Sequence, residues 1–334
     1  MILLKGRVFK LVLLLAIAAM TPSVIKAQTP MNEIPLGGGS TGGGAGTQSF
    51  GGALPDGDMG SGGLTASNGP EAAAFDGTYV WVATQFNNSI TRIRVSDGTV
   101  AGTFAVGKRP VALLYAGGSL YVANLLSNTV TKVTPSTGAI AGTFNAGDGP
   151  GGLAFDGMNI WVANRNGNTV TKISQNGAIL GTFTVGKRPV GLAFAAGSIW
   201  VANSKSKSVT RLSTAGTVLG TYAVGDGPFG VAEEGENVWV SNYFGKSVTK
   251  LRASDGLNLG EFNVGDGAAG IAFDGASVWV VCNGDNILAK VNPGSGSVIA
   301  TYATGKGPFS IAIGGSKVWV PNFSSNSIST TAAN

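Results

Sequence analysis

The sequence predicts an all-β fold: a seven-bladed β-propeller with four antiparallel strands in each blade. An aromatic residue followed by valine recurs seven times, 39 or 40 residues apart, at Trp81, Tyr121, Trp161, Trp200, Trp239, Trp279 and Trp319. A second anchor keeps the same spacing, at Pro70, Pro110, Pro150, Pro189, Pro228, Ala268 and Pro308. A period of about 40 residues with several short strands per unit is typical of propeller blades.

The unit that begins at Pro150 shows the plan of one blade. Four β-rich runs follow one another, which we name strands a to d: Gly152–Phe155, Ile160–Asn164, Thr169–Ser174 and Ile179–Val185. Asp156-Gly157 separates strands a and b, and Asn176-Gly177 separates strands c and d. Both dipeptides favour tight hairpins. Because one four-stranded sheet buries too little surface to be stable, we expect the sheets to stack around an axis with aromatic rings between them.

The last unit lacks one strand. From Pro308 it supplies strands a, b and c, and the sequence then ends. We expect an N-terminal strand to complete this blade and remove its open edge, and we assign that strand to Gly62–Ala66. The expected organisation is a signal peptide at residues 1–27, a Gly/Ser-rich flexible leader at residues 28–61 and the propeller at residues 62–334.

The first residues have the pattern of a secretory signal. Lys5, Arg7 and Lys10 precede an apolar run at Leu11–Met20, and small residues lead to an expected cleavage site at Ala27. The apolar run is too short to span a bilayer as a mature helix. We therefore expect a secreted or periplasmic protein with no transmembrane segment after signal removal.

The charge of the chain argues against nucleic acid as a partner. Four of the 22 Lys and Arg precede the cleavage site, which leaves 18 against 17 Asp and Glu. A nearly neutral protein lacks the broad positive field that nucleic-acid binding needs. Cys282 is the only cysteine, so no disulfide can form within the chain.

The repeat carries a family resemblance. Its motif G-x-x-P-x-G-(L/I/V)-A, followed by (I/V)-W-V-A-N, N-(T/S)-V-T-K and L-G-T-(F/Y), resembles the YVTN and NHL-type propeller repeats from about Leu64 onward. It is also similar to the virginiamycin B lyase (streptogramin lyase) group, a seven-bladed propeller family. That resemblance implies a carbon–oxygen lyase that opens a cyclic antibiotic ester with a histidine base and magnesium. The chain contains no histidine, so we assign no catalytic residue, no metal ligand and no cofactor.

The topology of a propeller narrows the place of a binding site. In an up-down meander the b–c loops and the d–a turns emerge on one face, which we call the loop face. Its aromatic candidates are Phe86, Phe229, Tyr243, Phe244, Phe309 and Phe323. Its basic candidates are Lys108, Arg109, Arg165, Lys187 and Arg188. An apolar arc opposite a basic arc suits an amphipathic or anionic small molecule, a peptide or a cell-envelope polymer, and the alternative is an ordinary mixed surface.

Residues that depart from the repeat are further candidates. Glu233 stands where other units have Phe, Tyr or Ile. It is either a carboxylate of raised pKa or a side chain that reaches water because strand a ends early. Cys282 stands where other units have Asn, and it is either a reactive thiol or a buried, inert one.

Two further sets of turn residues have a chemical and a structural interpretation. The acidic residues of the d–a turns, Asp148, Asp226 and Asp266, are either calcium ligands or positions that tolerate any turn residue. The asparagines that end strand b are expected to fasten the b–c turn through backbone hydrogen bonds: Asn124, Asn164, Asn203, Asn242 and Asn322.

The sequence therefore favours an exported, non-catalytic propeller that acts as a binding or scaffold module through its loop face. The alternative is an enzyme of the virginiamycin B lyase type, a carbon–oxygen lyase or hydrolase, with atypical active-site residues. This alternative rests on the similarity of the repeats alone.

Overall fold

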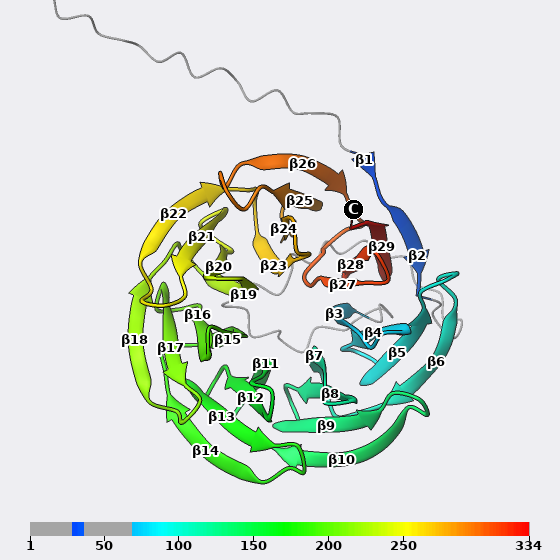
Figure 1. Cartoon of the computed structure of the whole chain (residues 1–334). Coiled ribbons are helices and arrows are strands. Elements are labelled where there is room, and N and C mark those ends of the chain that lie inside the picture. The colour runs from blue at the N-terminus through cyan, green and yellow to red at the C-terminus, as the bar shows by residue number, and fades with distance from the viewer. Residues whose placement is uncertain (1–28, 37–68, 334) are drawn as a thin grey trace, which may run out of the picture.

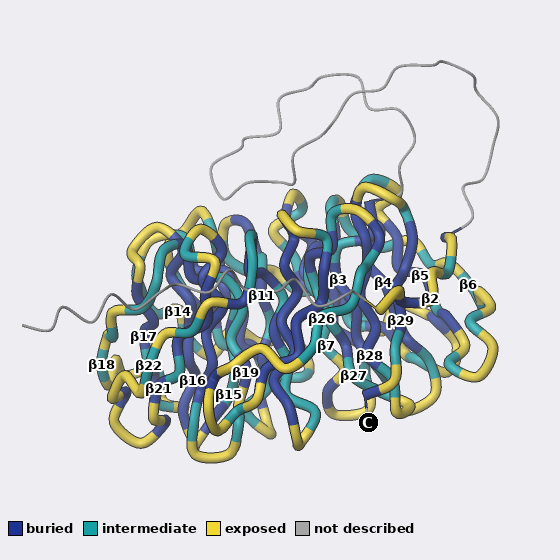
Figure 2. The backbone as a smooth tube through the Cα atoms, turned by 90° about the horizontal axis from the view of Figure 1, so that it is seen from above, coloured by how far each residue is buried: buried dark blue, intermediate teal, exposed yellow. Residues whose placement is uncertain are grey.

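Seven sheets, each with four antiparallel strands, stand around a central axis, as predicted (Figure 1). One of them gains a fifth strand that pairs in parallel. The computed structural model describes residues 29–36 and 69–333; the expected signal peptide, residues 37–61 and Gly62–Ala66 lie outside the described residues. The second and third strands of each blade are mostly buried, the outermost strand is half-buried or exposed, and the loops on the two faces are mainly exposed (Figure 2). Within the described part of the chain, no helix has the length and apolar character that crossing a membrane requires.

Blades 1 to 4 each consist of four consecutive strands. Blade 1 contains β3 (Pro70–Phe75), β4 (Tyr79–Thr84), β5 (Ser89–Arg94) and β6 (Val100–Ala105). Blade 2 contains β7 (Pro110–Ala116), β8 (Ser119–Asn124), β9 (Thr129–Thr134) and β10 (Ala139–Asn145). Blade 3 contains β11 (Pro150–Phe155), β12 (Asn159–Asn164), β13 (Thr169–Ser174) and β14 (Ile179–Thr184). Blade 4 contains β15 (Pro189–Ala195), β16 (Ser198–Asn203), β17 (Ser208–Ser213) and β18 (Val218–Ala223).

Blades 6 and 7 recruit strands from the N-terminal part of the chain. Blade 5 contains β19 (Pro228–Glu234), β20 (Asn237–Asn242), β21 (Ser247–Arg252) and β22 (Asn258–Asn263). Blade 6 contains β23 (Ala268–Phe273), β24 (Val278–Cys282), β25 (Ile287–Val291), β26 (Val298–Ala303) and the added β1 (Thr29–Pro30). Blade 7 contains β27 (Ala312–Gly314), β28 (Lys317–Asn322), β29 (Ser327–Ala332) and β2 (Asn32–Pro35).

An aspartate in the a–b turn holds both the turn and the central tryptophan of its blade. In blade 3, Oδ1 of Asp156 accepts hydrogen bonds from the amides of Met158 (2.9 Å) and Asn159 (2.6 Å), and Oδ2 accepts one from Trp161 Nε1 (2.8 Å). Burial raises the pKa of Asp156, but these hydrogen bonds outweigh it and leave the pKa below its ordinary value. The same tryptophan bond is made by Asp76 to Trp81, Glu234 to Trp239 and Asp274 to Trp279.

Neighbouring blades are joined by a basic side chain that crosses the seam between them. In blade 3, the Lys172 ammonium lies 5.2 Å from the centre of the Trp161 ring. It donates a hydrogen bond of 2.7 Å to the carbonyl oxygen of Thr214, in the c–d turn of blade 4. Equivalent bonds from strand c join Arg92 to Pro135, Lys132 to Gln175, Arg211 to Ser254 and Lys250 to Pro293. In blade 7 Thr330 occupies this position, and Lys317 of strand b bonds instead to Val95 in the c–d turn of blade 1. A lysine therefore also crosses the seam that closes the ring.

A second contact at the seams is formed by an aromatic side chain of strand d, which packs against a glycine in the c–d turn of the next blade. A Cβ atom at Gly177 would lie 2.1 Å from the Phe144 ring, and the φ of Gly177 is +93°. Both the available space and the backbone conformation therefore require glycine here. The same pairing joins Phe104 to Gly138, Phe183 to Gly216, Tyr222 to Gly256 and Phe262 to Gly296.

The strand that completes blade 7 is β2, which corrects the assignment of this strand to Gly62–Ala66. β2 pairs antiparallel with β29 and sets Ile34 opposite Ile328. Ile34 also lies against Gly98 of blade 1, where other seams have an aromatic ring. β1 pairs in parallel with β26 of blade 6 (Figure 1). We call residues 29–36 the N-terminal strap.

The strap also corrects the expectation of a flexible leader over residues 28–61, because residues 29–36 are folded. Pro30 and Pro35 make both strands look like turn sequence. Proline is nevertheless tolerated in strands at the edge of a sheet, and both strap strands lie at such an edge.

The strap yields a prediction about stability. Replacing Ile34 by alanine should lower the free energy of unfolding by about 1–2 kcal/mol, because this half-buried side chain fills the seam between blades 7 and 1. Denaturant unfolding measures the change. Asn32→Ala, at an exposed position of the same strand, should leave the midpoint nearly unchanged. Equal midpoints for the two variants would contradict a closing role for β2.

The seam cation yields a second prediction. Lys172→Met keeps the length of the side chain but removes its charge and its bond to Thr214. We expect a loss of about 1–3 kcal/mol in the free energy of unfolding, from the cation–π contact and the charge-assisted hydrogen bond together. Lys306→Met removes a charge from an exposed side chain and is the matched control. If the two variants have the same melting temperature, the seam bond contributes nothing measurable.

Candidate functional site

Strand a of every blade lines the central channel (Figure 1). The residue that follows the repeat's proline, or Ala268 in blade 6, lies where each chain leaves the d–a turn, at the loop face. We call these seven residues the mouth ring: Glu71, Val111, Gly151, Val190, Phe229, Ala269 and Phe309. All of them except Ala269 line a cavity of about 250 Å³. The mouth ring therefore forms the entrance to this cavity, and Glu71 is its only charged member.

Small residues come next along the channel and let the blades approach one another. They are Ala72, Ala112, Gly152, Gly191, Gly230, Gly270 and Ser310. A Cβ atom at Gly152 would lie 2.0 Å from the carbonyl oxygen of Val190, and one at Gly191 would lie 2.2 Å from that of Phe229. These glycines are needed because the neighbouring backbone is close, which explains the glycine of the P-x-G motif.

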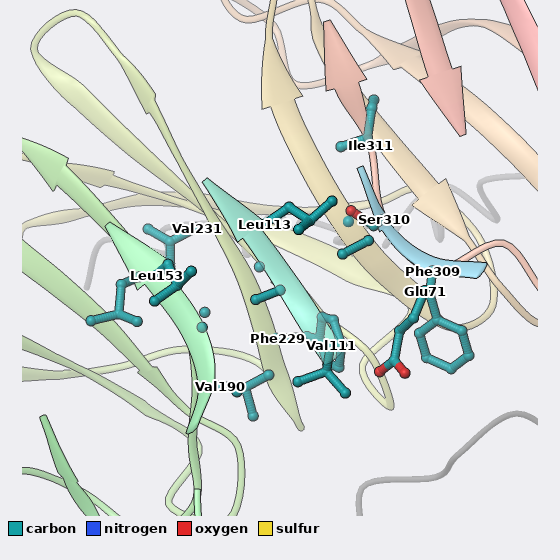
Figure 3. A pocket seen from close by; sticks show the side chains of 18 of the residues that line it. Glu71, Val111, Leu113, Leu153, Val190, Phe229, Val231, Phe309, Ser310 and Ile311 are labelled. Carbon is teal, nitrogen blue, oxygen red and sulfur yellow. The ribbon is translucent and has the colours of Figure 1, made fainter. Parts of the chain in front are cut away.

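A third layer along the channel is aliphatic. Leu113, Leu153, Val231 and Ile311 contribute side chains to the lining of the cavity (Figure 3). The cavity thus has a mixed entrance that includes Glu71 and Arg165, then a layer of small residues and an aliphatic layer. Such a combination of apolar walls with few polar groups is typical of small-molecule sites.

Glu71 has no compensating hydrogen bond on one side of its carboxylate. Its Oε2 atom is buried and has no hydrogen-bond partner among the described residues. The carboxylate lies beside the Phe309 ring (Figure 3). Burial raises the pKa of Glu71 to about 6, although the charges of Arg109 and Arg165 act in the opposite direction. The attraction of the two arginines is therefore too small to offset the effect of burial on this carboxylate.

Arg165 interacts with two other arginines, Arg109 and Arg188, and with Glu71. It extends from the b–c loop of blade 3 over Gly151, where a Cβ atom would lie 2.4 Å from the Arg165 Cδ atom. Burial lowers the pKa of Arg165 to about 10; the charges of Arg188 and Arg109 lower it further, and that of Glu71 opposes them. Arg165 is thus close enough to Arg109 and Arg188 to be repelled by both, and close enough to Glu71 to be attracted by it.

Arg109 and Arg188 occupy a backbone conformation that disfavours them. Their φ angles are +55° and +54°, whereas the five equivalent d–a turn positions are glycines with positive φ: Gly69, Gly149, Gly227, Gly267 and Gly307. The left-handed conformation costs a non-glycine residue about 1–2 kcal/mol. Their amides are held by Asn88 (2.9 Å) and Asn168 (2.8 Å). Retained strain of this kind is frequent at functional sites.

The aromatic candidates meet on the other side of the mouth. Phe86, Phe229, Tyr243, Phe309 and Phe323 form one cluster. The rings of Tyr243 and Phe309 stack with their centres 6.4 Å apart, and Phe86 meets Phe323 edge-on at 5.5 Å. Phe244 is exposed and contacts Tyr243. The cluster is largely buried, and Phe229 and Phe309 are its members that line the cavity.

The remaining basic candidates lie outside this arrangement. The side chains of Lys108 and Lys187 are exposed. Their backbone amides donate hydrogen bonds to the hydroxyls of Ser127 (2.7 Å) and Ser206 (2.7 Å). The structure therefore gathers Arg109, Arg165 and Arg188 around the channel mouth but leaves the two lysines on the open loop face.

The two residues that depart most visibly from the repeat have structural explanations. Cys282 is buried, and burial, together with the charges of Asp285 and Asp266, raises its pKa to about 12. Of the two alternatives for Cys282, a reactive thiol or a buried and inert one, the structure supports the second. Glu233 is exposed, as expected for a side chain that reaches water. However, β19 continues through Glu234, so strand a does not end early there.

The acidic turn residues form ion pairs and hydrogen bonds. Asp226 pairs with Lys207 at 3.0 Å and Asp266 with Lys246 at 2.9 Å, while Asp148 accepts a hydrogen bond of 3.3 Å from Asn166. Over residues 29–36 and 69–333, no three His, Cys, Asp or Glu side chains gather in a way that could hold a metal ion.

The repeated asparagines are structural, as expected, but mainly through side chains. The amide of Asn164 donates 2.8 Å to the hydroxyl of Thr171 in strand c, and its carbonyl accepts from the Gly147 amide at 3.0 Å. The hydroxyl bond recurs from Asn124, Asn203, Asn242 and Asn322.

Glu71 is the residue of this site that the sequence analysis missed. Departures from the repeat were sought at positions where an aromatic or asparagine is usual. Aligning the residue after each proline would have shown one carboxylate among Val, Gly, Phe and Ala. Aligning the preceding turn would likewise have shown Arg109 and Arg188 in the place of glycine.

Comparison with known proteins gives the fold but no closer relationship. No protein-family profile matches the sequence, and no curated protein sequence matches it. A streptogramin B lyase structure is similar with a TM-score of 0.70 and 18% identity, over 80% of this chain and 94% of that chain. Virginiamycin B lyase from Staphylococcus aureus is similar with a TM-score of 0.70 and 18% identity, over 79% of this chain and 95% of that one.

A protein of different chemistry has the same degree of similarity. The Kuenenia stuttgartiensis hydrazine synthase structure matches with a TM-score of 0.73 and 18% identity, over 82% of this chain and 98% of that chain. Because fold similarity at this identity is shared by unlike enzymes, it carries no activity with it. The chain is a seven-bladed β-propeller similar in fold to the virginiamycin B lyase group, which confirms the resemblance seen in its repeats.

Proposed function

We propose that the protein is an exported, non-catalytic binding module whose channel mouth binds a small ligand with an anionic group and an apolar body. One observation carries this proposal: three arginines surround the mouth, and two of them keep a strained backbone where five other blades have glycine. Packing alone does not require arginine at those turns, because glycine serves there in the other blades.

The electrostatic balance at the mouth favours an anion. Arg109, Arg165 and Arg188 outnumber the carboxylate of Glu71, and the pKa of Arg165 is lowered by burial and by its two cationic neighbours. An anionic ligand would relieve that repulsion. Guanidinium groups also bind carboxylate and phosphate oxygens in pairs, which adds orientation to the attraction.

The aromatic cluster supplies the apolar contact for the same ligand. Phe229 and Phe309 line the cavity together with the aliphatic layer below them. Aromatic side chains contribute large contact areas at small entropic cost. A cavity of about 250 Å³ suits a small molecule or the end of a chain, such as one terminus of a peptide.

The proposed export agrees with the position of the strap. The expected cleavage after Ala27 falls one residue before Thr29, the first residue of β1. Removal of residues 1–27 would therefore leave the strap intact at the mature N-terminus. N-terminal sequencing of the protein from culture medium or periplasm tests this step; a mature protein that begins beyond Leu36 would lack the closing strand and would contradict it.

Binding is tested with 3-phenylpropionate, a probe that has one carboxylate and one aromatic ring. We expect saturable binding by calorimetry, weakened at least tenfold in Arg165→Gln, which corresponds to about 1.4 kcal/mol. Added salt should weaken it as well. Arg94→Gln removes an exposed arginine that pairs with Asp97 in a c–d turn, on the opposite face, and should bind like the wild type. Absence of binding at about pH 5, below the pKa of Glu71, or equal binding by Arg165→Gln, would overturn the proposal.

A second candidate function, a lyase, is favoured by a single observation. The pKa of Glu71, at about 6, is in the range in which a carboxylate acts as a general base near neutral pH. Incubation with a cyclic depsipeptide and Mg²⁺, followed by mass spectrometry, tests this function. Linearised product that disappears in Glu71→Gln would support it, and absence of product with the wild type would exclude it for that substrate class.

A further inference from the structure

We propose that Glu71 makes the channel mouth selective for zwitterionic ligands, in which an ammonium group stands next to the anionic group, as in an α-amino acid with an apolar side chain. This inference rests on the binding function proposed above. It assigns the anionic group to the arginines, the ammonium group to Glu71 and the apolar body to the aromatic and aliphatic lining.

The first step of the argument is the buried, unpartnered carboxylate oxygen. Glu71 Oε2 has no donor among the described residues, although a buried carboxylate normally has its oxygens satisfied. The residue lines the cavity, so a donor can reach it from a bound ligand. An ammonium group supplies such donors together with the opposite charge.

The second step is that the neighbouring arginines do not take this role. Arg109 Nε donates to Gln85 Oε1 at 2.8 Å, and Arg165 lies over Gly151. Burial raises the pKa of Glu71 despite both arginine charges. A cation that contacts the Glu71 carboxylate directly would therefore stabilise its charged form more than the two arginines do. A purely anionic ligand would be repelled by this carboxylate.

The third step is the order of the groups around the mouth. Around the mouth ring, Glu71 of blade 1 comes between Phe309 of blade 7 and Val111 of blade 2, whose d–a turn carries Arg109. Figure 3 shows Glu71 and Phe309 at the cavity. A ligand whose carboxylate meets Arg165 can then turn its ammonium group toward Glu71 and its side chain toward Phe309. The groups of an aromatic α-amino acid are arranged around one carbon atom and satisfy all three directions.

The ionisation of Glu71 gives the selectivity a pH dependence whose sign follows from the structure. Above a pH of about 6 the carboxylate is charged, so it attracts ammonium and repels a lone anion. Below that pH it is neutral, so both effects are lost. The charged groups that act on Glu71 are Arg109 and Arg165, and arginine side chains carry their charge over this whole pH range.

The experiment compares L-phenylalanine with 3-phenylpropionate, which lacks only the amino group, by calorimetry at about pH 7.5 and about pH 5. We expect the wild type to bind L-phenylalanine at least tenfold more tightly than 3-phenylpropionate at the higher pH, and to lose most of this preference at the lower pH. Glu71→Gln should bind both probes with similar affinity at both pH values. Glu236→Gln, at an exposed position, should behave like the wild type.

The outcomes separate this inference from the function on which it rests. Equal or tighter binding of 3-phenylpropionate by the wild type at about pH 7.5 would overturn the zwitterion preference and leave the binding function standing. A preference that persists in Glu71→Gln would overturn the role of Glu71. Binding of neither probe would overturn both proposals.

A thermal measurement shows that Glu71→Gln is folded and checks the ionisation independently. A carboxylate whose pKa is raised by folding contributes stability in its protonated form, and this contribution is lost as the pH rises through the folded pKa. The melting temperature of the wild type should therefore fall relative to that of Glu71→Gln between pH 4.5 and about 6. A constant difference across that range would contradict the ionisation of Glu71 near pH 6.

Discussion

The ring depends on the basic side chain that blades 1 to 5 and blade 7 each extend over their own aromatic residue to the c–d turn of the next blade. Apolar wedging holds blades together but does not fix their relative height, whereas a bond from Lys172 to one carbonyl oxygen does. Blade 6 has the cation too, with Lys290 4.9 Å from the Trp279 ring. Blade 7 offers it no c–d turn, because its fourth strand is β2. The N-terminal strap spans that same seam, with β1 on blade 6 and β2 on blade 7.

The loop face has its own fastening between blades, and it explains why acidic turn residues vary. In four blades an asparagine of the b–c turn accepts a hydrogen bond from the next d–a turn: Asn88, Asn128, Asn168 and Asn286. In blades 4 and 5 a lysine replaces that asparagine, and it pairs with an aspartate of the next turn instead. Seams fastened at both ends fix the width of the channel. A fixed channel can hold Arg109 and Arg188 in a strained conformation.

The sequence was sufficient for the features that repetition reveals. Trp161 and its six counterparts gave the number of blades, and Asp156-Gly157 gave the hairpin. The closing strand was not predictable in the same way, because Ile34 replaces the aromatic ring and two prolines obscure the strands. Glu71 was missed for a different reason: its neighbours in the mouth ring are distant in sequence, and only the closed ring places it among the arginines. The aromatic residues were predicted to be exposed on the loop face. Tyr243 and Phe323 are instead buried, because they pack into one cluster with Phe309.

In a protein built from one repeated unit, whatever packing requires appears in nearly every copy. The c–d turn glycines, the strand b aromatic residues and the seam cations follow this rule. Glu71, Arg109, Arg165 and Arg188 do not, and each is locally unfavourable: an unpartnered carboxylate oxygen, two strained turns and a buried cation among cations. Four unfavourable departures at one end of one channel have a common cause if their charges are balanced by a ligand. The excess of arginines predicts an anionic group in that ligand, and the unpartnered Oε2 atom of Glu71 predicts a hydrogen-bond donor in it.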